Sequence, residues 1–280
     1  MPVDRFSDAD EFRKIAEPFL ARRESEHGLL LGLVGQLDTL HAGALAGIVR
    51  AAASDASRGD VVCVALRLDH RLVVSRVSAA DLIDSTASDL RDEPFEIVLG
   101  WPPLVERVAA LSKRTASRNL AQGIYACTRV IHPPPVADHG TRRLADDGDQ
   151  ETLITWHRAL AQSIGQHETY EDARASIARR LAEGALHVWE HGSRIVSSAA
   201  AVGATPHGIR VNFVYTPEEF RGRGYASALV ADLTQALLDG GRAFVFLHTD
   251  LSNPISNRLY QRIGYERVGD FLMMELGPRG

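Results

Sequence analysis

Two kinds of hydrophobic spacing alternate along the chain, and they predict helices and strands in turn. Residues 8–24 place Phe12 and Phe19 on one helical face, which predicts an amphipathic helix, and a second apolar segment covers 29–40. The runs VVCVALRL and RLVVSRV, joined by Asp69-His70, are typical of a strand hairpin. The first half therefore has the predicted order α-α-β-β-α-β-α-β, completed by a helix at 78–90, a strand at 95–100, a helix at 103–114 and a strand at 123–131.

The second half shows the same kind of pattern more clearly, and its predicted order is β-α-α-β-β-β-α-β-α-β. Its segments are TRRLA, a helix at 149–163, YEDARASIARRLAEG, LHVWE, RIVSSAAAVG, GIRVNFVYT, a helix after the turn at 217–224, AFVFLHTD, NPISNRLYQRIG and YERVGDFLMMEL. The two orders are similar enough that the halves could be distant repeats of one design. The predicted fold class is α+β, a mixed sheet with flanking helices.

The clearest boundary signal is HPPPVADHG at 132–140, because three consecutive prolines neither continue a helix nor belong in a central strand. A chain of 280 residues is long enough for two cores. We therefore expect an N-terminal α/β domain at 1–131, a Pro-rich linker at 132–140 and a second domain at 141–280.

Composition narrows the function classes. The net charge of −5, without blocks of like charge, gives no reason to expect a nucleic-acid partner. The apolar run at 29–34 is too short to cross a bilayer, and the first residues lack the apolar core of a signal peptide, so a cytoplasmic protein with no membrane partner is expected. Cys63 and Cys127 are the only cysteines, which excludes a disulfide scaffold and suggests buried core residues. Neither Lys14 nor Lys113 lies in a Gly-Lys-Ser/Thr sequence, which excludes a P-loop.

The stretch FVYTPEEFRGRGYASALVADL, from Phe213, combines a strand, a turn with two glycines and two arginines, and a helix. A helix leaves its first N–H groups without partners in the helix and carries partial positive charge there. Gly222 and Gly224 leave those groups uncovered, and Arg221 and Arg223 add charge, which favours a phosphate or pyrophosphate. A flexible turn whose glycines only permit tight packing is the alternative. A Rossmann site fits less well, because the turn is long and too few strands follow.

This stretch resembles motif A of the GNAT superfamily of acyl-CoA N-acyltransferases, Arg/Gln-x-x-Gly-x-Gly/Ala between a strand and a helix, which Arg221, Gly224 and Ala226 fill. The family often carries Asn, a Tyr seven residues later, then Gly and an aromatic; NPISNRLYQRIGY supplies Asn253 and Tyr260. The resemblance covers roughly 141–276. The first half has neither motif, and its nearest equivalent puts Trp-Pro-Pro in place of the glycines, so it would be a degenerate GNAT-like domain.

The resemblance implies an acetyl-CoA site. Backbone groups of Phe213, Val214 and Tyr215 would bind pantetheine and the acyl carbonyl, with an N–H near the thioester oxygen as oxyanion donor. This strand assignment could slip by one residue. The pyrophosphate would lie on the turn and first helical positions: Arg221, Gly222, Arg223, Gly224, Tyr225, Ala226 and Ser227. Asn253 and Asn257 would assist, although Asn253 is also a good helix N-cap before Pro254.

The resemblance also implies that Tyr260 protonates the departing CoA thiolate, a task that a phenol neutral at pH 7 can perform. Its alternative role is a core aromatic. His248 ends the strand before this helix and is the first candidate base; Glu190, water alone, or an ordinary strand histidine are the alternatives. His187 and His191 would be about 13 Å apart on a strand, so no metal is predicted.

The sequence therefore predicts an acyl-CoA-dependent GNAT N-acetyltransferase, an enzyme that moves an acetyl group from acetyl-CoA to an amine by direct attack. The acceptor would be a small-molecule or peptide amine, and a homodimer is one option for the oligomeric state. The alternatives are a non-catalytic CoA-binding or regulatory protein of the same fold, and an interaction module with no nucleotide site. Turnover of acetyl-CoA with a panel of amines would distinguish the enzyme from the non-catalytic CoA-binding protein. Failure to bind any CoA compound would favour the interaction module.

Overall fold

The computed structural model describes residues 3–37, 45–50, 59–131 and 140–278. The first half contains six strands and four α-helices in this described part. They are β1 (Val3–Phe6), α1 (Ala9–Leu20), α2 (Gly28–Gly35), β2 (Leu45–Arg50), β3 (Val61–Leu68), β4 (Arg71–Val74), α3 (Ile83–Leu90), β5 (Ile97–Gly100), α4 (Pro102–Ser112) and β6 (Ala116–Cys127).

The second half repeats this order element by element, so the predicted order β-α-α-β-β-β-α-β-α-β is confirmed there. Its elements are β7 (Thr141–Leu144), α5 (Gln150–Ser163), α6 (Tyr170–Ala182), β8 (Leu186–His191), β9 (Arg194–Val202), β10 (Gly208–Tyr215), α7 (Tyr225–Asp239), β11 (Phe244–Asp250), α8 (Pro254–Ile263) and β12 (Glu266–Leu276).

The order predicted for the first half was incomplete, because it lacked β1 and β2. β1 has only four residues, three of them half-buried, and so shows no clear alternation. β2 has the sequence LAGIVR inside an Ala- and Gly-rich stretch, which masks the strand signal. With these two strands included, the halves have the same order of elements.

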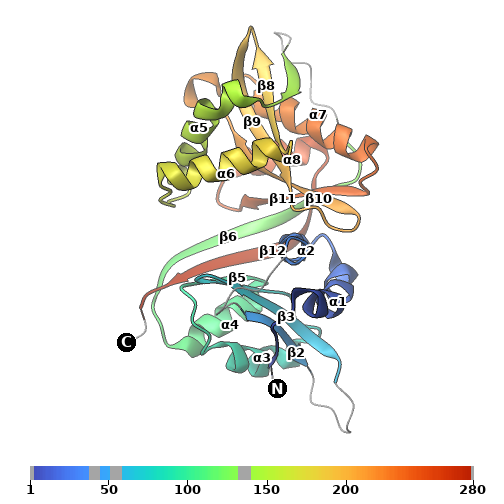
Figure 1. Ribbon diagram of the computed structural model, residues 1–280, viewed down its shortest axis with the longest axis vertical. Helices are drawn as coiled ribbons and strands as arrows, with labels where there is room; N and C mark the ends of the chain where they lie inside the picture. The colour runs from blue at the N-terminus through green and yellow to red at the C-terminus, as the bar shows by residue number, and fades with distance from the viewer. Residues whose placement is uncertain (1–2, 38–44, 51–58, 132–139, 279–280) are drawn as a thin grey trace.

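All twelve strands of the described residues belong to one mixed sheet with the order β1-β2-β3-β4-β5-β12-β6-β11-β10-β9-β8-β7. β12 pairs with β5, and β6 pairs with β11, so each half extends the sheet of the other with its last strand (Figure 1). β6 and β12 are also antiparallel neighbours over most of their length at the centre of the sheet. The mixed α+β fold with flanking helices is therefore confirmed.

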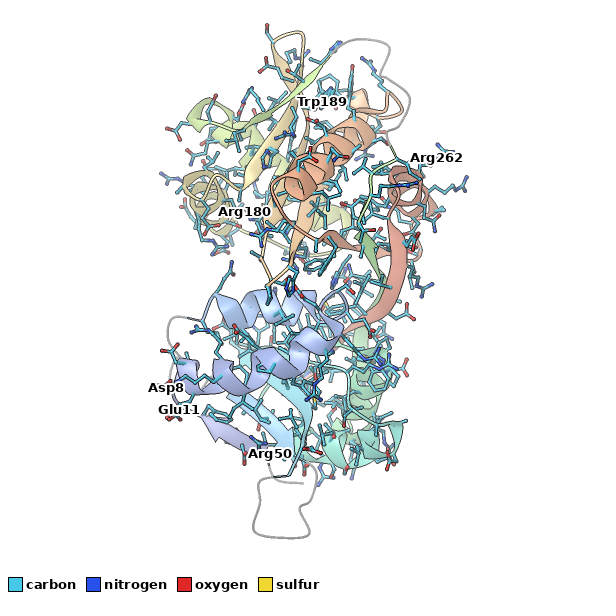
Figure 2. All side chains as sticks on the ribbon, turned by 90° about the vertical axis from the view of Figure 1, so that its right-hand side faces the viewer. Asp8, Glu11, Arg50, Arg180, Trp189 and Arg262 are labelled. Atoms are coloured by element: carbon cyan, nitrogen blue, oxygen red, sulfur yellow. The ribbon has the colours of Figure 1, made fainter. Side chains whose placement is uncertain are left out.

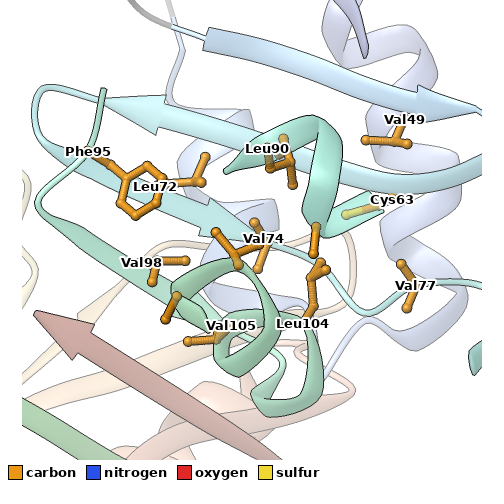
Figure 3. Packing of buried hydrophobic residues seen from close by; sticks show 14 of the residues in the cluster. Val49, Cys63, Leu72, Val74, Val77, Leu90, Phe95, Val98, Leu104 and Val105 are labelled. Carbon is orange, nitrogen blue, oxygen red and sulfur yellow. The ribbon is translucent and has the colours of Figure 1, made fainter. Parts of the chain in front are cut away.

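The hydrophobic cores also include side chains from the strands that the two halves exchange. The largest cluster of the first half includes Leu72, Val98 and Leu104 (Figure 3). Leu272 and Leu276 of β12 complete this cluster. In the second half, one cluster lies under α7 and α8 and contains Tyr125 and Cys127 of β6. The other face of the second half's sheet is covered by α5 and α6. Each half therefore completes a core with side chains from the other half.

The two halves also meet away from β6 and β12. The Glu24 carboxylate, just after α1, accepts hydrogen bonds from Thr205 Oγ1 at 2.6 Å and from the backbone N–H groups of His207 at 2.7 Å and Gly208 at 3.1 Å. Residues 132–139 of the expected linker lie outside the described residues. The expected domain boundaries stay a prediction.

Both cysteines are buried, as expected. Cys63 lies in β3 and Cys127 ends β6. Burial raises the pKa of the Cys63 thiol to about 12 and also raises the pKa of Cys127. Both thiols are therefore protonated and unreactive at neutral pH.

Candidate active site

The two central strands of the second half separate from one another toward their C-terminal ends. β10 pairs in parallel with β11 only over Gly208–Arg210, opposite Phe244–Phe246. Residues 211–215 and 247–250 continue as strands without pairing with each other. Edge N–H and C=O groups of β10 are left without a partner on that side, which is the arrangement that an extended ligand can use.

A β-bulge lies on β10 where the strands separate. Asn212 is opposite Ala200 of β9 and Tyr215 is opposite Ser198, so β10 contains one extra residue between these pairs. Phe213 takes up the bulge with φ at +51°, an unusual conformation for a bulky residue. Its side chain is buried against α5 and α6, where it contacts the His157 ring at 5.1 Å between centroids. Backbone strain of this kind is concentrated at functional sites.

The turn after β10 leads into α7 through the Arg-Gly-Arg-Gly stretch. Gly222 and Gly224 both have left-handed backbone conformations, with φ at +77° and +84°, which explains why glycine stands there. Gly224 is the N-cap of α7 and provides no side chain to accept from the first N–H groups of the helix. Arg221 Nε donates to Thr216 O at 3.0 Å and so braces the turn, while Arg223 is exposed. The α7 N-terminus is thus open to an anion.

Residues 221–227, which form the end of this turn and the start of α7, differ in exposure. Residues 221–224 are exposed, Ala226 and Ser227 are half-buried, and Tyr225 is buried with its ring 5.4 Å from that of His191. Tyr225 therefore anchors the helix start through its side chain. Only its backbone N–H can serve an anion at this helix end.

The corresponding strands of the first half do not separate. β4 and β5 pair in parallel along their whole length, from Arg71 opposite Ile97 to Val74 opposite Gly100. Gly100 approaches β4 so closely that a Cβ there would lie 2.0 Å from Val74 O. Two prolines, which lack N–H donors, then begin α4. At the corresponding position of the first half, the described residues therefore show neither the strand separation nor a glycine-led helix start.

α8 brings Tyr260 to the core under α7. The Tyr260 ring packs against that of Tyr265 at 5.9 Å, and its hydroxyl makes no hydrogen bond within the described residues. Burial raises the pKa of this phenol to about 12, so it is protonated at neutral pH. The Tyr265 hydroxyl, in contrast, is hydrogen-bonded to Thr234 Oγ1 at 2.6 Å.

Two asparagines fix the start of α8. Asn253 Oδ1 accepts from the backbone N–H groups of Ile255 at 3.2 Å and Ser256 at 3.1 Å, so this residue caps the helix. Asn257 Nδ2 donates to Asp250 O at 3.1 Å and ties α8 to the end of β11. The Asn257 Oδ1 atom is buried and has no hydrogen-bond partner in the described part of the chain. Asn257 is therefore the asparagine of this pair that is more available to a ligand.

His248 lies on β11 beyond the last residue that pairs with β10, and its ring is 4.7 Å from that of Phe271 on β12. Burial, and to a smaller degree the Arg210 charge, lowers the pKa of His248 to about 3. The imidazole is therefore neutral over the physiological range. Its Nε2 atom is buried without a hydrogen-bond partner among the described residues.

A second histidine near the bulge was not found by sequence reasoning. His157 of α5 pairs through Nδ1 with a carboxylate oxygen of Glu168, in the loop before α6, and its ring contacts Phe213. Burial lowers the pKa of His157, while Glu168 opposes that shift. In the sequence they were only one polar residue inside a helix and one in the loop beyond it, which is common on surfaces.

The other candidates from the sequence lie elsewhere. Glu190 forms an ion pair with Arg143 at 2.6 Å on β8 and β7. His187, also on β8, has a pKa lowered to about 4 by burial and by Arg142. Among the described residues, no group of three or more His, Cys, Asp or Glu side chains could hold a metal ion, and no helix is long and apolar enough to cross a membrane.

Comparisons with known proteins agree with this geometry. The family model "Acetyltransferase (GNAT) family" matches residues 151–265, from α5 to just before β12. A comparison with curated proteins found no match.

Among solved structures, similarity extends over nearly the whole chain. A GNAT-family acetyltransferase from Colwellia psychrerythraea has a TM-score of 0.63 at 9% identity, covering 99% of this chain and 100% of the other. A GCN5-related N-acetyltransferase from Sphaerobacter thermophilus has a TM-score of 0.62 at 18% identity, with 98% and 94% covered. A Drosophila protein has a TM-score of 0.67 at 12% identity, with 99% of each chain covered. At these identities the likeness concerns the fold. The family match covers residues 151–265, so this part of the second half is similar to the GNAT acetyltransferase family, and nearly the whole chain shares the fold of these solved structures.

Proposed function

We propose that the protein is an acyl-CoA-dependent N-acetyltransferase with acetyl-CoA as the donor. The observation that carries this proposal is the separation of β10 from β11 beside the open N-terminus of α7. Pantetheine would lie along the unpaired edge at Phe213, Val214 and Tyr215. The CoA pyrophosphate would accept hydrogen bonds from the α7 N-terminus, with charge supplied by Arg221 and Arg223.

The reaction is a direct transfer. The neutral amine attacks the thioester carbonyl, a C–N bond forms, the C–S bond breaks, and the amine loses a proton while the thiolate gains one. An N–H group at the bulge would stabilise the oxyanion, an effect worth about 3–4 kcal/mol where measured for single donors. Tyr260 would protonate the thiolate, because its phenol is protonated at pH 7 and its hydroxyl has no partner among the described residues.

Two histidines are candidate bases in this proposal, and water is the third option. His248 lies next to the strand separation, but a group with a pKa of about 3 is a weak base at neutral pH. His157 is supported by its contact with the bulge residue Phe213 and by the orienting carboxylate of Glu168. A third group that orients a base is the arrangement typical of catalytic pairs.

The pH dependence of kcat/KM separates these options. A base must be deprotonated, so activity falls as the pH falls through its pKa. For His157 we expect this loss to begin below the usual histidine value of 6.5, and to vanish in His157→Gln together with most of the rate. For His248 the loss would begin only near pH 3. An unchanged profile and rate in His157→Gln would exclude His157 as the base.

The test of the proposal itself is acetyl-CoA turnover, measured as release of free thiol, with a panel of amines that includes amino acids, polyamines and peptides. Binding of acetyl-CoA with amine-dependent thiol release is the expected result. Binding without turnover on any amine would favour the non-catalytic CoA-binding protein instead. Absence of binding to any CoA compound would contradict both.

A further inference from the structure

A cavity of about 600 Å³ lies between the two halves, within the range that holds a small-molecule ligand. One wall is α2 of the first half; the other comprises α6, the end of β9 and β10 of the second half. Figure 2 shows Arg180 at this junction, in the second half and facing α2. The second-half residues that carry the chemistry of the cavity are Arg180, Arg210 and Asn212.

The cavity opens on the face of the sheet opposite α7. Ile209 and Val211 of β10 pack into the core under α7 and α8. Arg210 and Asn212 alternate with them and therefore point to the face that carries α6. A ligand in the cavity would thus approach β10 from the side opposite the α7 N-terminus, where the proposed function places the CoA pyrophosphate.

Two arginines in this cavity have no direct acidic partner among the described residues, although Arg180 lies over the Phe213 ring at 5.8 Å and feels the more distant charges of Glu168 and Glu183. Within the described residues, neither Arg180 nor Arg210 has an ion pair or a hydrogen bond, and the Arg180 Nη1 and Arg210 Nε atoms are fully buried. Glu183, the one acidic residue among the described residues of the lining, lies 4.0 Å from Arg179. Burial, with repulsion from Arg180, lowers the pKa of Arg210 to about 10, so both groups stay charged at pH 7. Buried guanidinium groups without hydrogen-bond partners are costly, and this favours an anion that completes them.

Asn212 adds a neutral polar group at the bulge. Its Oδ1 atom is buried without a hydrogen-bond partner among the described residues, and it directly precedes Phe213. An amide oxygen there can accept from an amine N–H, which would hold that amine beside the separated part of β10. The wall from the first half and the end of β9 adds the apolar side chains of Leu29, Leu33 and Val202.

From this arrangement we propose that the cavity is the acceptor site and selects an amine that also carries a carboxylate, with an apolar α-amino acid as the simplest member of the class. The carboxylate pairs with Arg210 and Arg180, for which a planar anion is the matched partner. The amine is held by Asn212, and the side chain lies against Leu29, Leu33 and Val202. This inference rests on the proposed acetyl transfer for its account of the amine, but the carboxylate site can be tested without it.

The experiment compares matched acceptors with and without the carboxylate. L-Leucine and L-phenylalanine are each paired with their carboxamides, which keep the amine and the side chain and remove the negative charge. Acetyl transfer is measured for the four compounds, and their binding to the CoA-loaded protein is measured by calorimetry. The variants are Arg210→Met and Arg180→Met. The control is Arg174→Met, which removes an exposed arginine of α6 paired with Glu171 outside the cavity.

We expect the free amino acids to be preferred over their amides, mainly through KM. Arg210→Met should weaken amino-acid binding by about 30-fold or more, the usual loss when one member of a buried charge pair is removed. It should leave the amides and the affinity for CoA unchanged. Because it removes an unpaired buried charge, it should not lower the melting temperature. Arg180→Met should act in the same direction, and Arg174→Met should behave as wild type.

The outcomes separate this inference from the proposed function. Amides that equal amino acids in the wild type, or an unchanged preference in both Arg210→Met and Arg180→Met, would overturn the carboxylate site while leaving acetyl transfer intact. Amino-acid binding that is lost in Arg210→Met, without acetyl transfer to any amine, would support the carboxylate site and refute the transfer reaction.

Discussion

Tyr260 and Tyr265 belong to one core but differ in how their hydroxyl groups are partnered. Both rings pack under α7 and α8. The Tyr265 hydroxyl is bound to Thr234, whereas the Tyr260 hydroxyl makes no hydrogen bond within the described residues. Burial raises the pKa of both phenols. At the scale of single residues, a phenol with no structural partner is therefore the better candidate for a proton donor.

Tyr260→Phe keeps the ring and removes only the hydroxyl. We expect kcat to fall by roughly 10²- to 10⁴-fold, the usual contribution of a positioned acid, with little change in acetyl-CoA affinity or melting temperature. Tyr265→Phe is the matched control; it should lower stability by about 1 kcal/mol through the lost Thr234 bond and leave kcat nearly intact. A Tyr260→Phe enzyme with wild-type kcat would make Tyr260 a packing residue only.

The residues found from sequence and those missed differ in a simple way. Arg221, Gly224, Asn253 and Tyr260 belong to contiguous motifs, so their types and spacing were visible in the chain. Arg180, Arg210 and Asn212 meet only in the folded protein, at a cavity whose other wall is α2 of the first half. His157 and Glu168 were missed for the same reason, since one polar residue within a helix and one in the following loop are ordinary on a surface.

At the scale of elements, α7 begins after Gly224, so its first N–H groups have no side-chain cap. Ser227 lies in its first turn and is half-buried. An acidic residue in a first turn favours a helix, since it complements the partial positive charge, by about 0.3–1 kcal/mol. The same carboxylate would repel a pyrophosphate bound there. Ser227 therefore allows stability and anion binding to be changed in opposite directions.

Ser227→Asp should retain or slightly raise the melting temperature and weaken acetyl-CoA binding strongly, by 10-fold or more if electrostatic repulsion costs about 1.4 kcal/mol. Ser227→Asn, which has the same shape without the charge, should bind acetyl-CoA nearly as well as wild type. Gly224 is a poorer site for this test, since its φ of +84° would strain any side chain. Equal affinity in the two Ser227 variants would place the CoA phosphates elsewhere.

The elements themselves were largely predictable in the second half and less so in the first. The second half has clear period-2 strands and amphipathic helices, and its order was correct throughout. β6 begins at Ala116, before the predicted start at residue 123. The sequence did not reveal this part of the strand, because ASRNLAQ is polar and mostly exposed. The pairing of β6 with β11 and of β12 with β5 joins segments that are far apart in the sequence. No local sequence pattern specifies which of these distant strands pair with each other.

At the scale of the whole molecule, Glu24 connects the halves through an acidic contact. Burial raises its pKa, but hydrogen bonds from Thr205, His207 and Gly208 outweigh that effect, so the net pKa lies below the usual value of 4.5. A carboxylate with a depressed pKa contributes stability above its unfolded-state pKa and loses it as the pH falls through the folded-state value.

Glu24→Gln should therefore lower the free energy of unfolding by about 1–3 kcal/mol at pH 7, as expected for lost hydrogen bonds to a charged group. The difference from wild type should shrink as the pH falls below about 4.5. Denaturant melts at pH 7 and pH 4 measure it, with Glu106→Gln, an exposed glutamate of α4, as the control. A difference that is constant with pH would show that the Glu24 charge does not stabilise the contact.

The two halves share an order of elements, but only the second separates its central strands beside an uncapped helix. β4 and β5 pair along their full length, and Gly100 lies too close to Val74 O for a ligand to pass between the strands. Prolines begin α4 where glycine precedes α7. The whole chain should therefore bind one CoA molecule, in its second half.

Calorimetric titration of the full chain with acetyl-CoA tests this most directly, with the Ser227→Asp and Ser227→Asn variants alongside. The account predicts a stoichiometry of one per chain in the wild type and in Ser227→Asn, and an affinity at that single site at least 10-fold lower in Ser227→Asp. A stoichiometry near two would show that the first half binds CoA as well. No binding at all, or one site unaffected by Ser227→Asp, would contradict the assignment of the acyl-CoA site to β10 and the α7 N-terminus.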